Sequence, residues 1–568
     1  MSLKNVVPFL YPLILLSGCM SQLPSGSSDM EVASNEVMLE YREAISEEFL
    51  LGQLSAIAHD SLQGRETGMP GQKQAAHYLA GYYNQLGFKP MGDEGYFQYF
   101  GLNAEQTDSL VFSIYNVSGR DTALVRHEKA VPGNRPGFLR LAGSNTAHKG
   151  EILFAGFGVN DPSRGVHHLE GADFRDNWVL IFDDIPYIAN GDTLIDPSIT
   201  DINRPDSLFE KTGAAGILFI SGDSQESFES RSELASTLIQ KPRSMRLAYL
   251  DTSTRSVPDQ KGYLEVSPLL AAELLGLGSV DELEELREET IREISSFEAK
   301  ELGYQLDYRP YEGTREIRTE NVVALLEGAD PELRDEVVVL MAHYDHVGIT
   351  NPDNNGDMIN NGADDNGSGT AGLMAAAQAL HQAAEAGNRL KRSVLFLHVS
   401  AEEKGLLGSR YYSDHPAIPI EQTVTAFNAD MIGRSDARNV EAGDTDYVYI
   451  IGGNIISSEL DSLVHVANDR TVEMRLDYFF NDLQDRNQFY RRSDHWNFGR
   501  LGVPFVFFFT GVHEDYHRPS DHIENVDIPK LVRTSRLVYS STVEVANYDG
   551  RPGVDNEEFI EITRNRPR

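Results

Sequence analysis

Short stretches in the second half of the chain carry closely spaced histidine, aspartate and glutamate residues. Imidazole nitrogens and carboxylate oxygens together suit zinc or a similar divalent ion. A set with one bridging carboxylate suits two ions held roughly 3.5–4 Å apart, as in hydrolases that use two metals. The residues are His343 and Asp345, Asp364 and Asp365, Glu402 and Glu403, Asp430, and His517.

Short apolar runs precede most of these stretches and predict buried strands at 337–341, 394–399, 424–427 and 503–509. Continuous apolar runs are typical of parallel strands covered on both faces. An alanine-rich amphipathic segment at 369–384 predicts a helix between the first two. Sites in open α/β sheets assemble just outside the carboxyl ends of the strands. We therefore expect the acidic and histidine side chains to converge there.

The adjacent pair Glu402 and Glu403 can divide two tasks. Neighbouring side chains diverge at an irregular strand end, so one can bind metal while the other faces the attacking water. A carboxylate in the second position can take the proton of that water and return it to the leaving amine. Asp345, two residues after His343, is expected to accept the ring N–H of His343 and fix its tautomer.

The ordered motifs HYD, GADDNGSG, SAEEKGLLGS, NADMIG and YHRPSD resemble the co-catalytic zinc aminopeptidase family. Relatives of that family include glutamate carboxypeptidases and, more distantly, glutaminyl cyclases. The resemblance covers roughly residues 35–98 and 321–547. It implies an α/β fold with a mixed, mainly parallel sheet flanked by helices, and two zinc ions per chain.

The resemblance also implies a role for individual residues. Glu402 matches the general base, and Tyr516 stands where some relatives stabilise the tetrahedral intermediate. The motif Ser493, Asp494 and His495 is expected to support the site, although His495 itself is expected to be packed structurally. The metal ligands carried over by motif are His343, Glu403, Asp430, His517 and the bridging Asp365.

Two other metal motifs in the sequence are interpreted differently. Residues His513 to His517 match H-E-x-x-H, but that chemistry needs a helix, and Pro519 with no helical periodicity predicts a loop. An EF-hand register starting at Asp353 places Met358 where glycine is required. A serine hydrolase would need G-x-S-x-G, and no such pentapeptide occurs.

The N-terminus predicts export and lipid anchoring. Lys4 precedes an apolar run at 6–16 that is too short to span a bilayer, and Cys19 is the only cysteine of 568 residues. Small residues before a lone cysteine resemble the bacterial lipoprotein signal, with lipidation at Cys19. The protein is then anchored facing the periplasm or exterior, on the outer membrane in a Gram-negative cell. The net charge of −38 argues against nucleic acid as a partner.

The expected organisation has five parts. They are a signal peptide at 1–18, a tether at 19–34, a peptidase domain at 35–109 and 315–548, an insert at 110–314, and a loosely ordered polar tail at 549–568. The insert combines short β-like runs with glycine-rich turns and resembles the protease-associated domain found in this family. The sequence leaves the role of this insert and the oligomeric state open.

The expected function is hydrolysis of peptide bonds by a hydroxide held between two zinc ions, with an aminopeptidase as the first hypothesis. A carboxypeptidase or dipeptidase would use the same ligands, and a glutaminyl cyclase would release ammonia instead. Basic residues that could bind a substrate carboxylate are Arg434, Arg491 and Arg492. A receptor-like binding module would be expected to have lost ligands or the base, and all are present.

Overall fold

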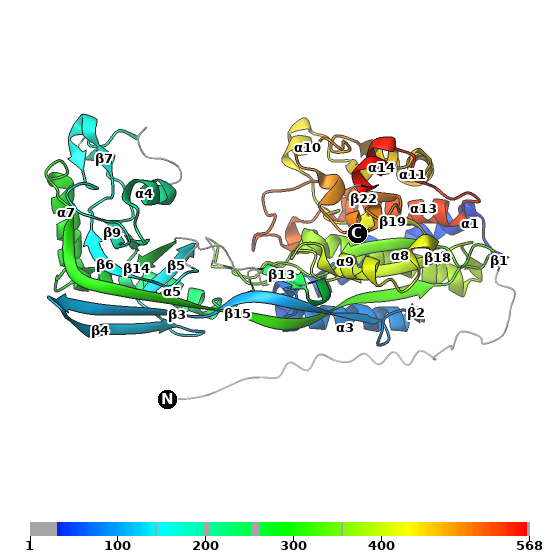
Figure 1. Ribbon diagram of the computed structural model, residues 1–568. Coiled ribbons are helices and arrows are strands. Elements are labelled where there is room, and N and C mark those ends of the chain that lie inside the picture. Colours follow the sequence, from blue (N-terminus) through cyan, green and yellow to red (C-terminus); the bar gives the residue numbers. More distant parts are fainter. Residues whose placement is uncertain are drawn as a thin grey trace, which may run out of the picture.

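The computed structural model describes residues 31–142, 145–189, 191–197, 204–242, 244–250, 262–350, 352–353 and 356–564. These residues form two lobes joined by a long ribbon of strands (Figure 1). The ribbon consists of β3 (Phe97–Ser118) and β15 (Lys300–Leu326), which pair antiparallel from Val322 opposite Phe97 to Tyr304 opposite Asn116. The boundaries predicted at 110 and 314 fall inside these two strands, so both lobes share them.

One lobe, here called the peptidase lobe because it contains most of the predicted peptidase domain, has a mixed sheet in the order β21-β20-β22-β19-β16-β18-β15. β16 pairs in parallel with β18 and β19, and β19 pairs in parallel with β22. β15 and β20 join antiparallel. This confirms the predicted mixed, mainly parallel sheet. The strands are β16 (Val337–His343), β18 (Ser393–Val399), β19 (Thr423–Ala429), β20 (Tyr447–Gly452), β21 (Arg475–Asp477) and β22 (Phe505–Phe509).

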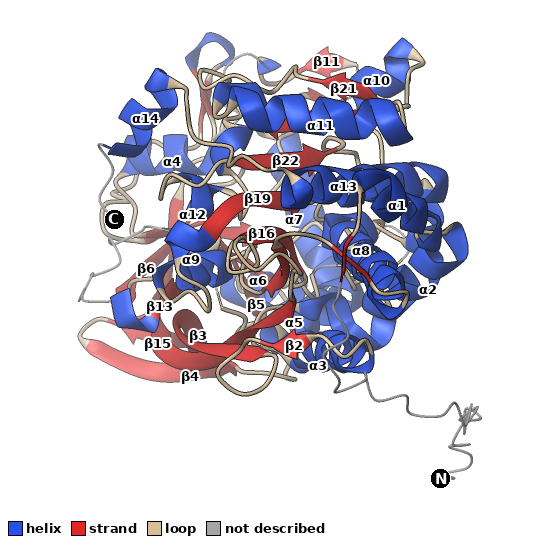
Figure 2. Ribbon diagram, turned by 90° about the vertical axis from the view of Figure 1, so that its right-hand side faces the viewer, coloured by secondary structure: helices blue, strands red, loops and turns tan. Residues whose placement is uncertain are grey.

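Both faces of this sheet are covered, because successive side chains of a strand point to opposite sides. In β16, Val338 and Leu340 enter one core while Val337 and Val339 enter another. Figure 2 shows α1, α2, α8 and α13 on one side of β16 and β19, with α9 and α12 on the other. The helices of this lobe are α1 (Asn35–Glu40), α2 (Glu47–Ile57), α3 (Pro70–Gln85), α8 (Gly369–Glu385), α9 (Leu407–Asp414), α10 (Ala437–Ala442), α11 (Ser458–Thr471), α12 (Trp496–Gly499) and α13 (Ile528–Asn547).

The expectation of a loosely ordered tail after residue 548 is wrong for its described part. Residues Glu557–Arg564 form helix α14, and Phe559 is fully buried. The Phe559 ring packs against Trp496 and Phe505, with centroids 6.4 and 6.1 Å away. Phe559, with Ile562 partly buried beside it, packs this helix against the core.

The second lobe, here called the insert lobe, continues the sheet from β15 in the order β6-β9-β12-β14-β5. β6, β9, β12 and β14 pair in parallel, and β5 closes the edge antiparallel. The lobe has its own core around Trp178, Leu180 and Leu218. Its main elements are β4 (Asp121–Ala130), β5 (Phe138–Ala142), β6 (His148–Phe154), β9 (Trp178–Phe182), α4 (Arg204–Thr212), β12 (Gly216–Ile220), α5 (Gln225–Thr237), β14 (Tyr263–Val266), α6 (Pro268–Leu274) and α7 (Val280–Arg292). Strand β13 (Ser244–Leu247) belongs to the same inserted segment but pairs with β3 beside the peptidase lobe (Figure 1). Its assignment to the protease-associated type stays a prediction.

Several two-residue strands complete the fold. They are β1 (Glu31–Val32), β2 (Lys89–Pro90), β7 (Asn160–Asp161), β8 (Val166–His167), β10 (Ile188–Ala189), β11 (Asp192–Thr193) and β17 (Asn388–Arg389). The signal peptide and Cys19 lie outside the described residues. Within the described part, no helix combines the length and apolar content needed to cross a bilayer.

Candidate metal centre

The predicted site residues converge at the carboxyl ends of the peptidase-lobe strands. His343 is the last residue of β16, and Asp430 directly follows β19. Glu402 and Glu403 lie in the turn after β18. Asp365 lies in the non-helical kink of the turn that precedes α8, while His517 comes from the loop after β22.

A first cluster forms around His343, which is 1% exposed. Its Nε2 atom lies 3.3 Å from Oδ1 of Asp365 and 3.3 Å from Oδ1 of Asp430. These three atoms surround one point from three different chain segments. The structure therefore brings together the predicted ligands of one ion.

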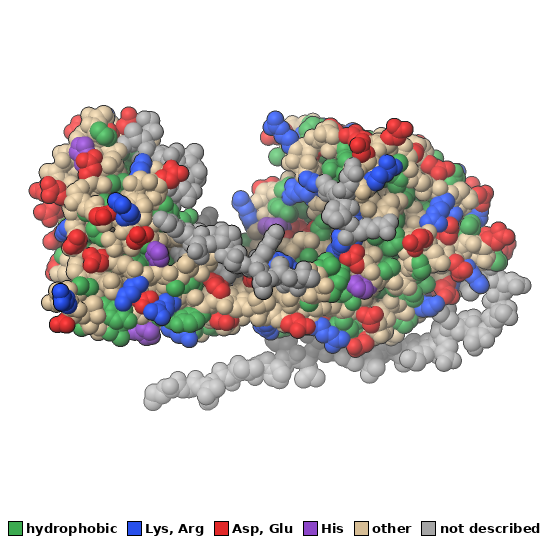
Figure 3. Space-filling model, viewed as in Figure 1, with side chains coloured by type: hydrophobic (Ala, Val, Ile, Leu, Met, Phe, Trp, Pro, Cys, Tyr) green, Lys and Arg blue, Asp and Glu red, His purple; other side chains and the backbone are tan. Residues whose placement is uncertain are grey.

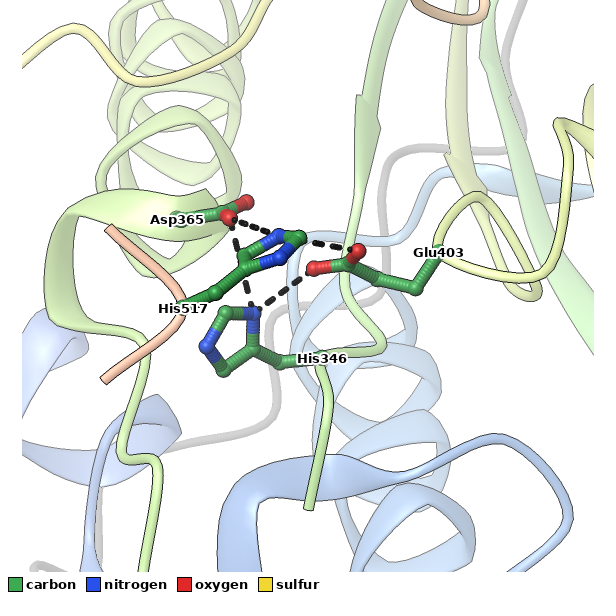
Figure 4. Close-up of side chains that lie close together, drawn as sticks. All are labelled: His346, Asp365, Glu403 and His517. Atoms are coloured by element: carbon green, nitrogen blue, oxygen red, sulfur yellow. Dashed lines mark hydrogen bonds and ion pairs between the residues drawn. The ribbon is translucent and has the colours of Figure 1, made fainter. Parts of the chain in front are cut away.

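A second cluster lies on the other side of Asp365 (Figure 4). Nε2 of His517 is 3.1 Å from Oδ2 of Asp365 and 3.1 Å from Oε2 of Glu403. Asp365 thus turns one carboxylate oxygen towards His343 and the other towards His517. This is the arrangement that a bridging carboxylate needs.

His346 joins the second cluster and was missed by the sequence analysis. Its Nδ1 atom lies 2.9 Å from Oε1 of Glu403 and 3.7 Å from Oδ2 of Asp365. Burial and the charge of Asp365 disfavour the ionised form of Glu403, but the hydrogen bond from His346 and the nearby His517 outweigh them and lower the pKa of Glu403 to about 2. The carboxylate therefore accepts and the His346 ring donates. His346 therefore holds the oxygen of Glu403 that is turned away from His517. The sequence does offer a signal for His346, because it directly follows the motif HYD and could have been included among the candidate site residues.

The charges of the site are unbalanced without a cation. Burial opposes protonation of His343, but Asp430 and Glu402 outweigh it and raise its pKa well above the usual range. Likewise, against burial, Asp365 and Glu403 raise the pKa of His517 to about 10. Protons are drawn to both rings because buried carboxylates surround them.

A pair of divalent cations fits these residues. Four-coordinate zinc with ligands at about 2.0–2.2 Å separates its ligand atoms by roughly 3.3–3.5 Å, close to the 3.1–3.3 Å found in both clusters. Oδ2 of Asp365 and Nε2 of His517 are also buried, and neither has a hydrogen-bond partner in the described part of the chain. A cation would replace the protons on the rings and occupy these atoms.

The prediction that the Asp345 carboxylate accepts the ring N–H of His343 is wrong, because the backbone carbonyl of Asp345 takes that place. Nδ1 of His343 lies 3.1 Å from the backbone carbonyl of Asp345 and 3.9 Å from its carboxylate. The carboxylate instead accepts from the Thr67 hydroxyl at 2.8 Å and from the Glu402 backbone N–H at 3.2 Å. The tautomer is still fixed by residue 345, while its side chain orients the turn of Glu402.

Glu402 faces a pocket beside the first cluster. Burial, together with the charges of Glu403 and Asp494, raises the pKa of Glu402 well above its usual range, although His343 opposes the shift. A carboxyl group with a raised pKa can both take and return a proton near neutrality. The pocket is lined by His343, Asp365, Glu402, Glu403, Asp430, Met431, Phe489, Arg492, Ser493, Phe507, Phe509, Val512 and Tyr516.

Tyr516 and Ser493 both contact the site. The Tyr516 ring stacks on His517 with centroids 3.8 Å apart, and burial with nearby carboxylates raises its pKa, so the hydroxyl keeps its proton. Ser493 donates to Oδ2 of Asp430 at 2.7 Å. His495 lies 4.7 Å from Phe507 between ring centroids and is fully buried, which confirms its packed structural role.

The stretch His513 to His517 is a loop, as predicted. His513 points away from the two clusters and lies 3.4 Å from Asp364. The sequence motif therefore does not form a single-zinc site. Of the basic candidates, Arg434 pairs with Asp515 at 2.9 Å, whereas Arg492 lines the pocket.

Arg65 is a second residue that the sequence analysis missed. Its fully buried guanidinium donates to the carbonyls of Tyr344 at 2.8 Å, Asn361 at 2.6 Å and Gly362 at 3.0 Å. It thereby ties the loop after His343 to the loop that leads to Asp365. The sequence marks Arg65 only as part of a break between helical segments.

Residues 321–542 match the profile of Peptidase family M28. The matched segment starts within β15, ends in α13 and contains every predicted ligand.

The curated relatives match the same region. Aminopeptidase YwaD of Bacillus subtilis (strain 168) is 26% identical over 230 residues, which are 38% of this chain and 43% of that protein. A probable leucine aminopeptidase of Arthroderma benhamiae is 27% identical over 222 residues, 38% of this chain and 56% of that protein. The chain thus spans about half the length of the curated relatives that it matches.

Solved structures of similar architecture include the aminopeptidase from Aneurinibacillus sp. strain AM-1, with a TM-score of 0.46 and 16% identity over 92% of this chain and 98% of that chain. Another is BSAP, a zinc aminopeptidase from Bacillus subtilis, with a TM-score of 0.47 and 16% identity over 90% of this chain and 98% of that chain.

Proposed function

We propose that this protein is a zinc-dependent exopeptidase of the aminopeptidase type that holds two zinc ions. The observation that carries the proposal is Asp365, whose two oxygens face His343 and His517 with Glu402 close by. The M28 profile over residues 321–542 and the aminopeptidase names of the relatives support the same class.

Bound zinc would polarise the scissile carbonyl and make a water molecule more acidic. The ions would be held by His343 and Asp430 on one side, by Glu403 and His517 on the other, and by Asp365 between them. His346 would keep Glu403 in orientation by its 2.9 Å hydrogen bond.

The residues of the chain would then move one proton. Glu402 would take it from the attacking water as the new carbon–oxygen bond forms, and would then deliver it to the leaving nitrogen, so that the bond between carbonyl carbon and nitrogen breaks in a second step. The protonated hydroxyl of Tyr516 would donate to the oxygen that becomes negative in the transition state. No side chain forms a covalent bond to the substrate.

The pocket indicates a preference for an apolar side chain next to the cleaved bond. Apart from the acidic residues and His343, its walls are mostly aromatic and aliphatic, and Glu402 lines the same pocket. Arg492 is its one basic side chain and lies over the Phe489 ring at 4.9 Å. That arginine favours a carboxypeptidase as the second candidate, because it could bind a free substrate carboxylate.

The test uses the chain without residues 1–19 and has two measurements. Bound metal is counted by elemental analysis, and activity is assayed on dipeptides blocked at the amino end or at the carboxyl end. Two zinc ions with activity only on free amino ends would establish the aminopeptidase. Activity only on free carboxyl ends would favour the second candidate, while ammonia release from N-terminal glutamine without peptide cleavage would indicate the cyclase.

We also propose that the protein is exported and lipid-anchored at Cys19. The support is the apolar run at 6–16, which ends in Leu16 and is followed by Ser17 and Gly18 before the only cysteine. Expression of the full chain and of Cys19→Ala, followed by membrane fractionation, tests this. Equal amounts of both proteins in the membrane fraction would contradict it.

A further inference from the structure

The insert lobe reaches the candidate metal centre through one lysine. Lys241 lies between α5 and β13, in a part of the chain that the predicted insert contains. Its Nζ atom donates to the carbonyls of Val347 at 2.7 Å and Ile349 at 2.8 Å. It also lies 3.3 Å from Oε2 of Glu66. All three donors of this ammonium group therefore have acceptors.

The loop that Lys241 contacts directly follows His343 and His346 of the two clusters. Val347 and Ile349 follow His346, and the other edge of this loop is fixed by His346 N–H to the Arg65 carbonyl at 3.2 Å and Gly348 N–H to the Gly64 carbonyl at 3.1 Å. The carbonyls on the opposite edge would lose the donor that Lys241 supplies. The loop is thus clamped from both edges, one by the peptidase lobe and one by the insert lobe.

Glu66 connects Lys241 to the turn that carries Glu402 and Glu403. Its side chain is 6% exposed, and its Oε1 atom accepts from Lys404 at 2.9 Å. Lys404 directly follows Glu403 in the chain. One buried carboxylate therefore connects the insert-lobe lysine with the turn that carries Glu402 and Glu403.

A separate apolar contact supports the position of Lys241. Strand β13 pairs antiparallel with β3, from Ser244 opposite Glu105 to Leu247 opposite Leu102. Met245 and Leu247 pack in one small core with Ala401, the residue before Glu402. Ala401 has a left-handed backbone, with φ of 61°, which costs free energy in a residue with a side chain and needs support from its neighbours.

We propose that Lys241 is a positioning residue of the metal centre, by which the insert lobe fixes the loop after His343. This inference rests on the proposed function, and it assigns the insert lobe a part in the chemistry of the other lobe. Lys241 contacts neither cluster directly. Its effect must pass through the carbonyls of residues 347 and 349 and through Glu66.

The experiment compares Lys241→Met, which keeps the apolar stem and removes the donors, with Lys241→Arg, which keeps donors and charge. Lys211→Met is the matched control, because Lys211 is an exposed lysine on α4 of the same lobe. For each purified, zinc-loaded protein we would measure kcat and KM on an amino-terminal dipeptide substrate, the rate of zinc release to a chelator, and the thermal unfolding midpoint. Lys241→Gln replaces the methionine variant if the latter does not fold.

In Lys241→Met, kcat should fall by about tenfold and zinc release should accelerate by a similar factor, the lower end of what loss of a supporting residue costs a metal site. KM should stay within twofold, and Lys241→Arg should recover most of both losses. A changed unfolding midpoint with unchanged kcat and zinc release would overturn the proposal. Equal losses in Lys211→Met would overturn it too. If the parent protein cleaves no peptide but Lys241→Met still releases zinc faster, the proposed function fails and the positioning role stands.

Discussion

The two lobes build their sheets from the same kind of strand but differ in what surrounds the acidic residues near the strand ends. β9 and β12 of the insert lobe are as fully buried as β16 and β18 of the peptidase lobe. In the insert lobe these acids face arginines: Glu265 pairs with Arg231 at 3.0 Å, and Asp184 pairs with Arg287 at 3.3 Å. In the peptidase lobe they face histidines and one another (Figure 4).

This difference separates a structural use of carboxylates from a chemical one. An arginine keeps its charge at all relevant pH values, so a carboxylate beside it is already neutralised. Carboxylates beside histidines attract a cation, because a histidine can release its proton and bind metal as a neutral ring. Among the described residues, both groups that could hold a metal lie in the peptidase lobe. Figure 3 shows the molecule hollowed between the two lobes, which leaves room for a substrate.

The sharpest test of this comparison exchanges one acid in each lobe for its amide. Glu402→Gln should lower kcat by about 10²–10⁴-fold, the usual contribution of a general base, while zinc content is retained. Glu265→Gln, the matched change in the insert lobe, should leave kcat within twofold. Steady-state kinetics and elemental analysis check both, and a fully active Glu402→Gln protein would refute the assigned role.

Removal of the bridging carboxylate should cost the metal itself. Asp365→Ala takes away an oxygen that faces each histidine, so we expect zinc bound after gel filtration to fall from two ions per chain to less than one. Asp184→Ala in the insert lobe should keep both ions. Retention of two tightly bound ions by Asp365→Ala would show that the carboxylate does not bridge.

His346 should matter less than a direct ligand. His346→Ala removes the hydrogen bond to Oε1 of Glu403, and loss of such a supporting bond costs about 10–100-fold in metal affinity or activity. Competition with a zinc chelator measures the affinity. Complete loss of one ion would instead make His346 a ligand, and an unchanged affinity would leave it without a role.

The smallest expected effect concerns a histidine in the insert lobe. His168 accepts from the Phe157 N–H and lies 3.0 Å from the Ile294 carbonyl, and burial lowers its pKa to about 4. The folded pKa lies below the unfolded value of about 6.5, so the unfolded chain binds the proton first. Stability is therefore lost as the pH falls from about 6.5 to 4, by at most about 3 kcal/mol.

His168→Gln should flatten the dependence of the unfolding midpoint on pH in this range, because the amide can accept and donate in the same places without titrating. Thermal melts from pH 7 to pH 4 measure it. An unchanged slope would mean that His168 is already protonated in the folded protein or that other groups dominate.

Much of the peptidase lobe could be predicted because its signals are local. The apolar runs at 337–341 and 394–399 predict strands that the structure has at Val337–His343 and Ser393–Val399. The residue types after each strand, together with the rule that parallel strands end at one edge, were enough to bring His343, Asp365 and Asp430 together.

The predictions that the structure corrects concern side chains for which the sequence allows several partners. The spacing of His343 and Asp345 allows the ring of His343 to hydrogen-bond either the carboxylate or the backbone carbonyl of residue 345. The sequence does not show that the Thr67 hydroxyl binds the carboxylate instead. The burial of Phe559 could not be predicted either, because the rings that pack against it are more than fifty positions away in the sequence. Long-range contacts of this kind are not encoded in any window of the sequence.

The ribbon of β3 and β15 has a consequence for the order in which the protein folds. Asn116 pairs with Tyr304 and Phe97 pairs with Val322, so each of these contacts closes a loop of roughly two hundred residues. Such non-local pairing is slow in an unfolded chain. If the intervening segment folds first, it brings the two strands close together and shortens the loop that must close. On a ribosome, where β3 emerges long before β15, the folded insert lobe would then hold β3 in place until β15 completes the sheet of the peptidase lobe.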